Sequence, residues 1–181
     1  MRSRRNPCTR EAGTDVRFES GLWAWPRKNT VINIRPMRTA DLDVLMPYEQ
    51  DMFGTESWSR QGYADELADL ATRYYVVAEE DGQVLGSGGL MTIAETSQVM
   101  TVGVLPPARR RGIGELLMHE LLAEARRRAA DEVLLEVRID NPAARGLYEK
   151  LGFDVIGTRR GYFDHGRVDA LVMRLELRTE R

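Results

Sequence analysis

The chain is poor in the residues that build metal centres and covalent cross-links. Its 181 residues include one cysteine, Cys8, and two histidines, His119 and His165. A single cysteine excludes a disulfide framework within the chain and a cysteine-rich zinc or iron–sulfur site. Two histidines argue against a multi-histidine metal centre. We therefore expect no metal, and we assign neither histidine to chemistry.

The chain also lacks the marks of a membrane protein or of a protein that coats nucleic acid. Near its N-terminus the longest apolar run is Leu22–Trp25, which is shorter than a signal-peptide core or a membrane span. The net charge of −2 argues against a generally basic, nucleic-acid-coating surface. The length and the hydrophobic content of 43% predict one domain with a sizeable buried core.

Charge is unevenly distributed along the chain. Residues 1–30 carry seven basic and three acidic residues, a net charge of +4, and the other 151 carry 19 basic and 25 acidic, a net charge of −6. The head shows no periodicity, so we expect a basic, disordered extension before a domain over residues 31–177. The alternatives are an organellar transit peptide and a translation start at Val16 or Val31. Mass spectrometry of the native N-terminus separates them.

Hydrophobic periodicity predicts an α/β domain with the element order βααβββαβαββ and a mixed sheet. We expect a strand over 31–35, a helix that Thr39 caps, and a second helix that Ser59 caps and that carries Leu70. A three-stranded meander over 73–105 follows, with a tight turn at Asp81-Gly82. The remaining elements are a helix from Gly112, a strand over 131–138, a short helix from Asn141 to Gly152, and strands over 153–158 and 169–177.

The segment from Val102 to Glu115 is the most informative part of the chain. A strand ends at Pro106-Pro107, and an arginine-rich turn with two glycines then opens a helix. The N-terminus of a helix exposes unpaired N–H groups that favour a phosphate, and Gly112 and Gly114 allow the backbone close to it. The alternative is a solvated basic turn, because the spacing matches neither a P-loop nor a dinucleotide fingerprint. The apolar stripe of this helix is Ile113, Leu116, Leu117, Leu121, Leu122 and Ala125.

This turn resembles motif A of the Gcn5-related N-acetyltransferases (GNAT), Arg/Gln-x-x-Gly-x-Gly/Ala, which Arg109, Gly112 and Gly114 match in register. The resemblance implies the GNAT fold, with a mixed, mostly antiparallel central sheet flanked by helices. It also implies acetyl-CoA as cosubstrate, with the pyrophosphate at the turn and the pantetheine arm along the preceding strand. The implied cofactor-binding residues are Val102, Val104, Arg109, Arg110, Arg111, Gly112, Ile113, Gly114, Asn141 and Tyr148.

A second stretch resembles motif B of the same family. It consists of Leu135-Glu136-Val137-Arg138, then Asn141, then Leu147-Tyr148-x-x-x-Gly152-Phe153. It is most similar to the branch that acetylates the N-terminal alanine of a small-subunit ribosomal protein. Arg159–Phe163 and Asp169-Ala170 share that likeness, which covers Val31–Leu177. Three features depart from the branch and leave the acceptor open: Pro142, the pair Arg145-Gly146, and a longer loop over 53–58.

Two residues of motif B are candidates for chemistry. Glu136 interrupts an apolar strand, where a carboxylate is costly unless it is solvated or partnered. On its own it could pair with Arg138 or Arg145, but the resemblance implies a general base for the acceptor ammonium. Tyr148 at helical spacing could be a core residue, but the resemblance implies an acid for the departing thiolate. Asn141 is predicted to cap its helix and, by resemblance, to contact the pantetheine arm.

The resemblance implies direct transfer of an acetyl group to a protein N-terminal α-amine, with a ribosomal protein as acceptor. It assigns the peptide groove to Trp58, Tyr162 and Phe163, although the two later aromatics could simply decorate a hairpin. An acetyltransferase of a lysine, a polyamine or an antibiotic stays open, as does a non-catalytic acyl-CoA sensor. Nucleic-acid binding is a weaker alternative. We expect a cytoplasmic monomer or weak dimer that binds neither nucleic acid nor membrane.

Overall fold

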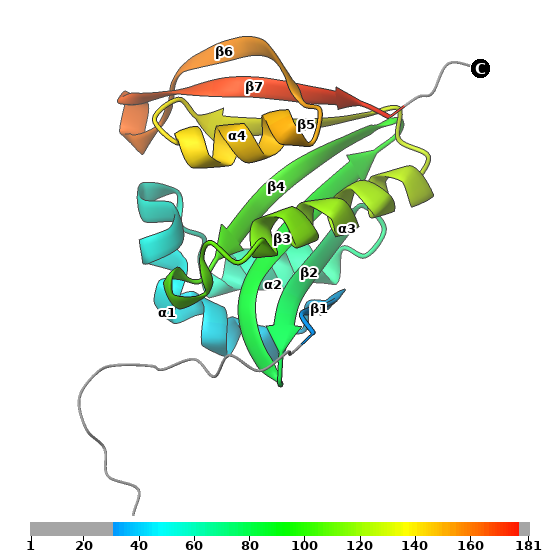
Figure 1. Ribbon diagram of the computed structural model, residues 1–181, viewed down its shortest axis with the longest axis vertical. Coiled ribbons are helices and arrows are strands. Elements are labelled where there is room, and N and C mark those ends of the chain that lie inside the picture. The colour runs from blue at the N-terminus through cyan, green and yellow to red at the C-terminus, as the bar shows by residue number, and fades with distance from the viewer. Residues whose placement is uncertain (1–30, 178–181) are drawn as a thin grey trace, which may run out of the picture.

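A computed structural model describes residues 31–177, so the expectations for residues 1–30 lie outside the described part of the chain. Seven strands form one sheet in the spatial order β1-β2-β3-β4-β5-β7-β6 (Figure 1). The strands are β1 (Asn33–Pro36), β2 (Arg73–Glu80), β3 (Gln83–Ile93), β4 (Thr96–Val104), β5 (Glu132–Arg138), β6 (Asp154–Phe163) and β7 (Val168–Glu176). The helices are α1 (Leu42–Phe53), α2 (Arg60–Ala68), α3 (Ile113–Arg127) and α4 (Pro142–Lys150). This order confirms the predicted βααβββαβαββ pattern.

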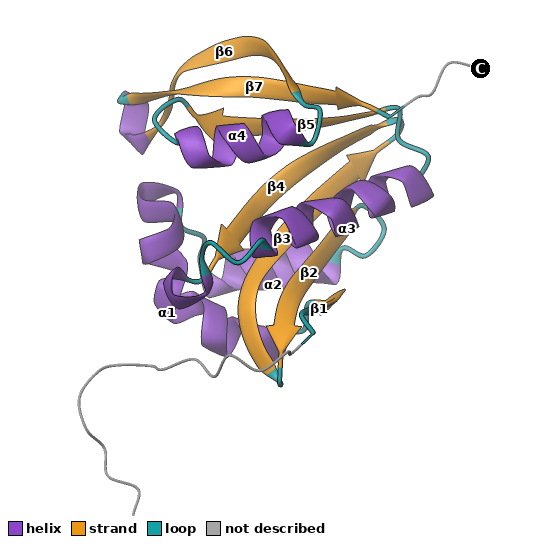
Figure 2. Ribbon diagram, in the orientation of Figure 1, coloured by secondary structure: helices purple, strands orange, loops and turns teal. Residues whose placement is uncertain are grey.

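Helices cover both faces of the sheet (Figure 2). Gly88 of β3 lies under Leu121 of α3, whereas its neighbour Gly89 lies under the ring of Tyr75, on the face that α2 covers. Successive residues of a strand point to opposite faces, so a single strand supports both layers. Within residues 31–177 every helix is too short or too polar to cross a membrane.

All neighbouring strands pair antiparallel except β4 and β5. That parallel pairing is short, since it joins only Thr96–Gln98 to Glu132–Leu134. Beyond this point the two strands separate, and Figure 1 shows β4 leaving β5 at an angle. The sheet therefore consists of a larger part, β1–β4, and a smaller part, β5–β7, that meet at one narrow junction.

The predicted caps of two helices are confirmed and one is wrong. Ser59 accepts the N–H of Gly62, and Asn141 accepts the N–H of Ala144. Thr39 instead opens a short 3-10 turn, Thr39–Asp41, that precedes α1. The capping hydrogen bond of this turn is made by Asp41, whose carboxylate accepts the backbone N–H of Arg38. The same carboxylate binds the guanidinium of Arg35 at 2.7 Å. A charged acceptor with two donors prevails over a threonine hydroxyl.

Some predicted positions and boundaries also differ from the structure. Leu70 lies beyond the end of α2 and is 79% exposed, and Leu116 lies outside the buried stripe of α3, where Met118 takes its place. Strand β6 continues to Phe163, so Tyr162 and Phe163 belong to a strand end and not to a loop. Two register shifts along β6 bend it, which explains why its later half lacks a clear alternation.

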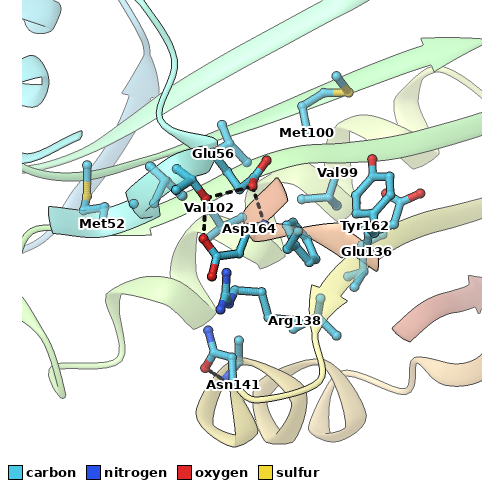
Figure 3. Close-up of a pocket in the computed structure, with 18 of the residues that line it drawn as sticks. Met52, Glu56, Val99, Met100, Val102, Glu136, Arg138, Asn141, Tyr162 and Asp164 are labelled. Atoms are coloured by element: carbon cyan, nitrogen blue, oxygen red, sulfur yellow. Dashed lines mark hydrogen bonds between the residues drawn. The ribbon is translucent and has the colours of Figure 1, made fainter. Parts of the chain in front are cut away.

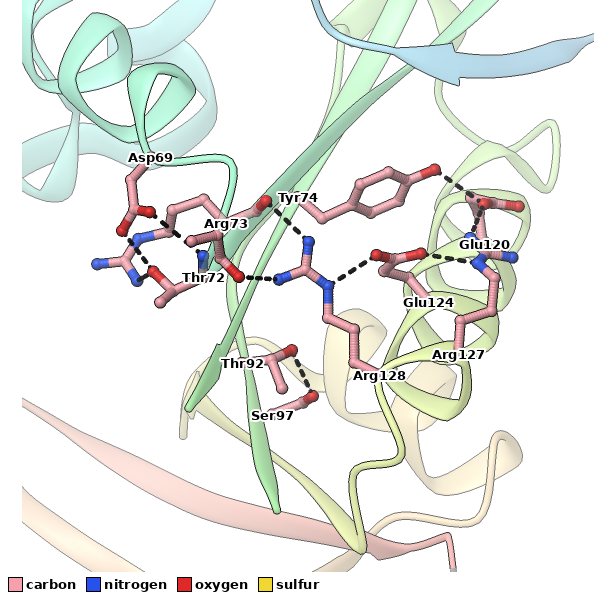
Figure 4. Close-up of polar contacts among 11 residues, drawn as sticks. Asp69, Thr72, Arg73, Tyr74, Thr92, Ser97, Glu120, Glu124, Arg127 and Arg128 are labelled. Carbon is pink, nitrogen blue, oxygen red and sulfur yellow. Dashed lines mark hydrogen bonds and ion pairs between the residues drawn. The ribbon is translucent and has the colours of Figure 1, made fainter. Parts of the chain in front are cut away.

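Polar contacts attach the end of α3 to the start of β2 (Figure 4). Arg128 donates to the backbone oxygens of Ala71 and Arg73 and pairs with Glu124 at 2.7 Å. The Tyr74 hydroxyl donates to Glu120 at 3.0 Å, one turn earlier on the helix. These contacts fix the axis of α3 from its C-terminal end, so its N-terminus is held in place beside β4.

Candidate active site

The separation of β4 and β5 opens a large cleft. Its volume is about 860 Å³, and it is lined by residues from both strands, α1, α4 and the ends of β6 and η4 (Asp164–Gly166) (Figure 3). It brings together seven residues that the sequence singles out: Trp58, Val102, Glu136, Asn141, Tyr148, Tyr162 and Phe163. Val104, the last residue of β4, and the turn over 109–114 that follows it do not line this cavity.

The free edge of β4 offers backbone groups to the cleft. Leu105 donates to the backbone oxygen of Leu85, and the pairing register continues as Val104–Gly86, Gly103–Ser87 and Val102–Gly88. Because hydrogen-bonded and non-bonded pairs alternate in an antiparallel ladder, the N–H and C=O of Val102 and Val104 point away from β3. Donation from the Arg109 Nε to the Val104 oxygen at 3.2 Å agrees with that direction. The register shift places Met100 in a bulge on the same strand.

The glycine-containing turn presents further donors. Gly112 precedes α3 with a φ of 78°, and Arg110 is also left-handed, with a φ of 62°. The first intrahelical bond runs from the Leu116 N–H to the Gly112 oxygen, so the N–H groups of residues 113–115 have no intrahelical acceptor. A Cβ on Gly112 would meet nothing within 4 Å. The turn is thus an open concavity of backbone donors at the positive end of a helix dipole.

The three arginines of the turn have different surroundings. Arg111 pairs with Glu80 at 2.7 Å, and that glutamate is only 2% exposed. This contact ties the turn to the end of β2 and directs the Arg111 side chain toward the protein. All three arginines are exposed, and Arg109 also donates to the backbone oxygen of Val104. Gly114 lies between Leu147 of α4 and Val104 of β4, which places the turn at one end of the cleft.

Glu136 has two partners that differ from those expected. Burial alternates along β5, and Glu136 lies on the less buried face, opposite the buried Leu135 and Val137. Gln98 donates to its Oε2 at 2.9 Å, and Arg159 lies 3.0 Å from its Oε1. The two arginines expected from the sequence are engaged elsewhere, Arg138 with Asp140 and Arg145 with Glu149.

Asn141 caps the N-terminus of α4, and Tyr148 is the buried residue of the same helix, two turns further along. Tyr148 is 9% exposed, its ring packs against Phe153 with centroids 6.0 Å apart, and it still lines the cleft. Burial raises the pKa of its phenol to about 12. The phenol is therefore protonated at neutral pH, as a proton donor must be.

The opposite wall of the cleft comes from the connection between α1 and α2. Glu49, 2% exposed, accepts the backbone N–H of Trp58 at 2.9 Å and the hydroxyl of Tyr63 at 3.2 Å. Desolvation raises the pKa of the Glu49 carboxyl, and the two hydrogen bonds oppose that shift. Trp58 packs on Tyr63 and Tyr75, so a buried carboxylate and an aromatic cluster together hold this loop in place.

Sequence reasoning missed the polar residues that join the two loops at the cleft mouth. The N–H of Asp164, in η4, donates to Glu56 at 2.9 Å, and the Thr55 hydroxyl donates to both carboxylates (Figure 3). Asp140 and Arg138 line the same mouth. The contacts of Gln98 and Arg159 with Glu136 were also missed. Their partners come from distant parts of the chain, which no local motif reveals.

The comparison with known families agrees with this geometry. A model described as the acetyltransferase (GNAT) family matches residues 42–153. The chain belongs to the GNAT family. It is an N-acetyltransferase that uses acetyl-CoA, and the resemblance seen in its two motifs is confirmed.

Relatives of this GNAT protein include enzymes that modify N-termini. A putative ribosomal protein bS18-alanine N-acetyltransferase of Bacillus subtilis is 31% identical over 140 residues, which cover 77% of this chain and 92% of the relative. The N-alpha-acetyltransferase RimI of Mycobacterium tuberculosis is 36% identical over 148 residues, 79% and 91% of the two chains. The crystal structure of the ribosomal-protein-S18-alanine N-acetyltransferase of Escherichia coli superposes with a TM-score of 0.74 at 27% identity, covering 83% and 97%.

The residues of this GNAT cleft fit acetyl-CoA. The turn before α3 supplies unpaired N–H groups for a pyrophosphate, with open space at Gly112. The outward-facing groups of Val102 and Val104 match the amide-bearing pantetheine arm, as an added strand would. Asn141 already caps α4 through its side-chain oxygen, which leaves its amide NH₂ for a ligand.

Proposed function

We propose that this GNAT enzyme acetylates the α-amine at the N-terminus of a protein, of the ribosomal-protein-alanine type. The observation that carries the proposal is the single cleft that Glu136, Tyr148 and the free edge of β4 all line. The relatives from Bacillus subtilis and Escherichia coli are named as a putative and an established ribosomal protein bS18-alanine N-acetyltransferase, which supports the same acceptor class here.

Charge at the cleft mouth supports a cationic acceptor. Glu56, Asp140 and Asp164 line the mouth, and the cation among them is Arg138, which pairs with Asp140 at 2.9 Å. An α-ammonium therefore enters a region with an excess of negative charge, which raises its local concentration. Tyr162 and Phe163, in contact with ring centroids 4.9 Å apart, supply an apolar wall for the first residues of a peptide.

In the proposed reaction Glu136 accepts a proton from the acceptor ammonium and so produces the free amine. Acetyl-CoA supplies an acetyl thioester. The amine nitrogen bonds to the carbonyl carbon as the carbon–sulfur bond breaks, and N–H groups of the β4 edge donate to the carbonyl oxygen. Tyr148 donates its hydroxyl proton to the departing sulfur, and the second proton of the nitrogen, lost as the amide forms, returns through solvent to the Tyr148 oxygen.

Substitution of the base tests the catalytic assignment. Glu136→Gln keeps the size of the side chain but removes its negative charge, and with it the proton acceptor and one of the two contacts with Gln98 and Arg159. We expect kcat to fall by roughly 10²-fold or more, with the dissociation constant of acetyl-CoA within a factor of about two, measured by calorimetry. Full activity of Glu136→Gln would refute the assignment, and lost acetyl-CoA binding would indicate a structural role.

A panel of amines tests the acceptor. Peptides with a free N-terminal alanine, the same peptides with a blocked N-terminus and an internal lysine, and spermidine are compared by release of free thiol. We expect turnover only with the free N-terminus. Preference for spermidine would assign the acidic mouth to a polyamine instead. Acetyl-CoA binding without turnover of any amine would indicate a sensor.

A further inference from the structure

Two donors divide the oxygens of the Glu136 carboxylate between them. Gln98 Nε2 lies 2.9 Å from Oε2, and Arg159 Nη1 lies 3.0 Å from Oε1. The Glu136 side chain is only 10% exposed, whereas that of Arg159 is 54% exposed. One oxygen is therefore held from inside the cleft and the other from the solvent side.

Gln98 occupies the point at which the sheet divides. It is the last residue of β4 that pairs with β5, opposite Leu134, and Glu136 lies two residues further along β5. The Gln98 amide thus spans the opening gap just where the strands begin to separate. Because an amide is neutral, this hydrogen bond orients the carboxylate without cancelling its charge.

Arg159 reaches Glu136 from the outer strand of the smaller part of the sheet. It lies on β6, which pairs with β7 and not directly with β5. Its guanidinium also lies 5.3 Å from the centroid of the Tyr162 ring, and Tyr162 lines the cleft (Figure 3). Arg159 therefore contacts two groups at once, a carboxylate and an aromatic face, and it can lose one contact while it keeps the other.

We propose that Gln98 positions Glu136 for catalysis and that Arg159 competes with the acceptor ammonium for the outward-facing oxygen of Glu136. This inference rests on the proposed role of Glu136 as base. Gln98 holds Oε2, so Oε1 faces the acceptor side. Arg159 occupies that oxygen in the free enzyme and stays on the Tyr162 ring when an ammonium displaces it.

The other charged groups of the cleft have partners of their own and do not contact the Glu136 carboxylate. Arg138 faces the mouth but pairs with Asp140, and Glu56 and Asp164 are joined to each other through Asp164 N–H. The residues of β4 that line the cleft carry no charge, and the titratable residue that α4 contributes to the lining is Tyr148. Within residues 31–177, Arg159 is the cation that contacts Glu136.

Kinetics of Arg159 variants test the competition, with the best amine of the panel above as acceptor. Arg159→Met should lower the acceptor KM by roughly two- to fivefold, the range of a half-exposed ion pair, without lowering kcat. Arg159→Lys keeps the charge and should resemble wild type. Arg160→Met, the same change at the exposed neighbour, controls for the loss of one surface charge. An acceptor KM that is unchanged or raised in Arg159→Met would refute the competition.

A double-mutant cycle tests the positioning role of Gln98. Gln98→Leu should lower kcat by about tenfold and leave the acceptor KM within twofold, because it removes a hydrogen bond to a charged group. In the Glu136→Gln background the same change should have no further effect. Thr96→Val is the control, since it removes a bond from the same strand to Glu132 at 3.2 Å. An equal loss in both backgrounds would refute the role of Gln98, whereas full activity of Glu136→Gln alone would refute the proposed base.

Discussion

Burial of Tyr148 has two opposing consequences for its chemistry. Desolvation raises the pKa of its phenol to about 12, which keeps the proton in place at every physiological pH. The same burial makes the phenol a weaker acid than a thiol, whose ordinary pKa is about 8.5. The hydroxyl of Tyr148 therefore first donates a hydrogen bond to sulfur as negative charge develops there, and its proton moves to sulfur only late, when the carbon–sulfur bond has largely broken.

Removal of that hydroxyl should slow the reaction without weakening binding. We expect Tyr148→Phe to lower kcat by roughly 10²-fold, with the dissociation constant of acetyl-CoA within about twofold. In wild type, ionisation of Tyr148 should cause no loss of kcat below pH 10. Tyr74→Phe is the matched control, because burial raises the pKa of Tyr74 to about 12 as well and its hydroxyl binds Glu120 outside the cleft. Equal rates for Tyr148→Phe and Tyr74→Phe would exclude a role for the Tyr148 hydroxyl.

Glu49 should make stability depend on pH. Its pKa is raised by desolvation, so the native state holds its proton more firmly than the unfolded state. That contribution is fully present below the unfolded pKa and is lost as pH rises through the folded pKa. We therefore expect the Tm of wild type relative to Glu49→Gln to be highest near pH 4 and to decrease toward pH 8. A constant difference in calorimetric scans across this range would contradict the prediction.

Among the elements, α1 depends on a glycine of β4 for its position. A Cβ on Gly103 would lie 2.7 Å from Phe53 Cζ and 3.0 Å from Met52 Sδ, and both side chains line the cleft. The absence of a side chain at Gly103 thus lets the end of α1 rest directly on the strand.

Gly103→Ala should therefore damage both stability and acceptor recognition. We expect a loss of about 1 kcal/mol in the free energy of unfolding, the low end of the range for overpacked sites because the ends of both side chains can shift, and a raised acceptor KM. Gly157→Ala in β6 is the control, since a Cβ there meets nothing within 4 Å. Denaturant titration and peptide kinetics measure the two effects. If both variants behave alike, α1 does not depend on this contact.

Local signals predicted the elements well, and long-range contacts account for what was missed. The caps at Ser59 and Asn141 were predictable because each acts within three residues. The pairing of Glu136 with Arg159 was not predictable. It depends on the spatial order β5-β7-β6, which a pattern along one strand cannot reveal. Arg138 and Arg145 are closer to Glu136 in sequence, but they pair with Asp140 and Glu149. The roles assigned to the site residues remain proposals.

At the largest scale, the sheet of the described residues consists of two segments that meet at one short parallel pairing. Strands β1–β4 and β5–β7 share the pairing of Thr96–Gln98 with Glu132–Leu134. Beyond it, the contacts across the cleft include Gln98 with Glu136 and Lys150 of α4 with Glu115 of α3 at 2.7 Å. A ligand that binds the β4 edge, the turn before α3, and α4 would therefore join the two segments.

Acetyl-CoA should for this reason protect the smaller segment as well as the turn. Because a ligand that binds only the native state stabilises it by RT ln(1 + [L]/Kd), a hundredfold excess over Kd supplies about 2.7 kcal/mol. We expect slower amide hydrogen exchange in α4 and β5, measured by mass spectrometry, in addition to the first turn of α3. Glu136→Gln should show the same protection, because it binds without turnover. Protection confined to the turn before α3 would mean that the ligand does not span the cleft, and the proposed contact with Tyr148 would then fail.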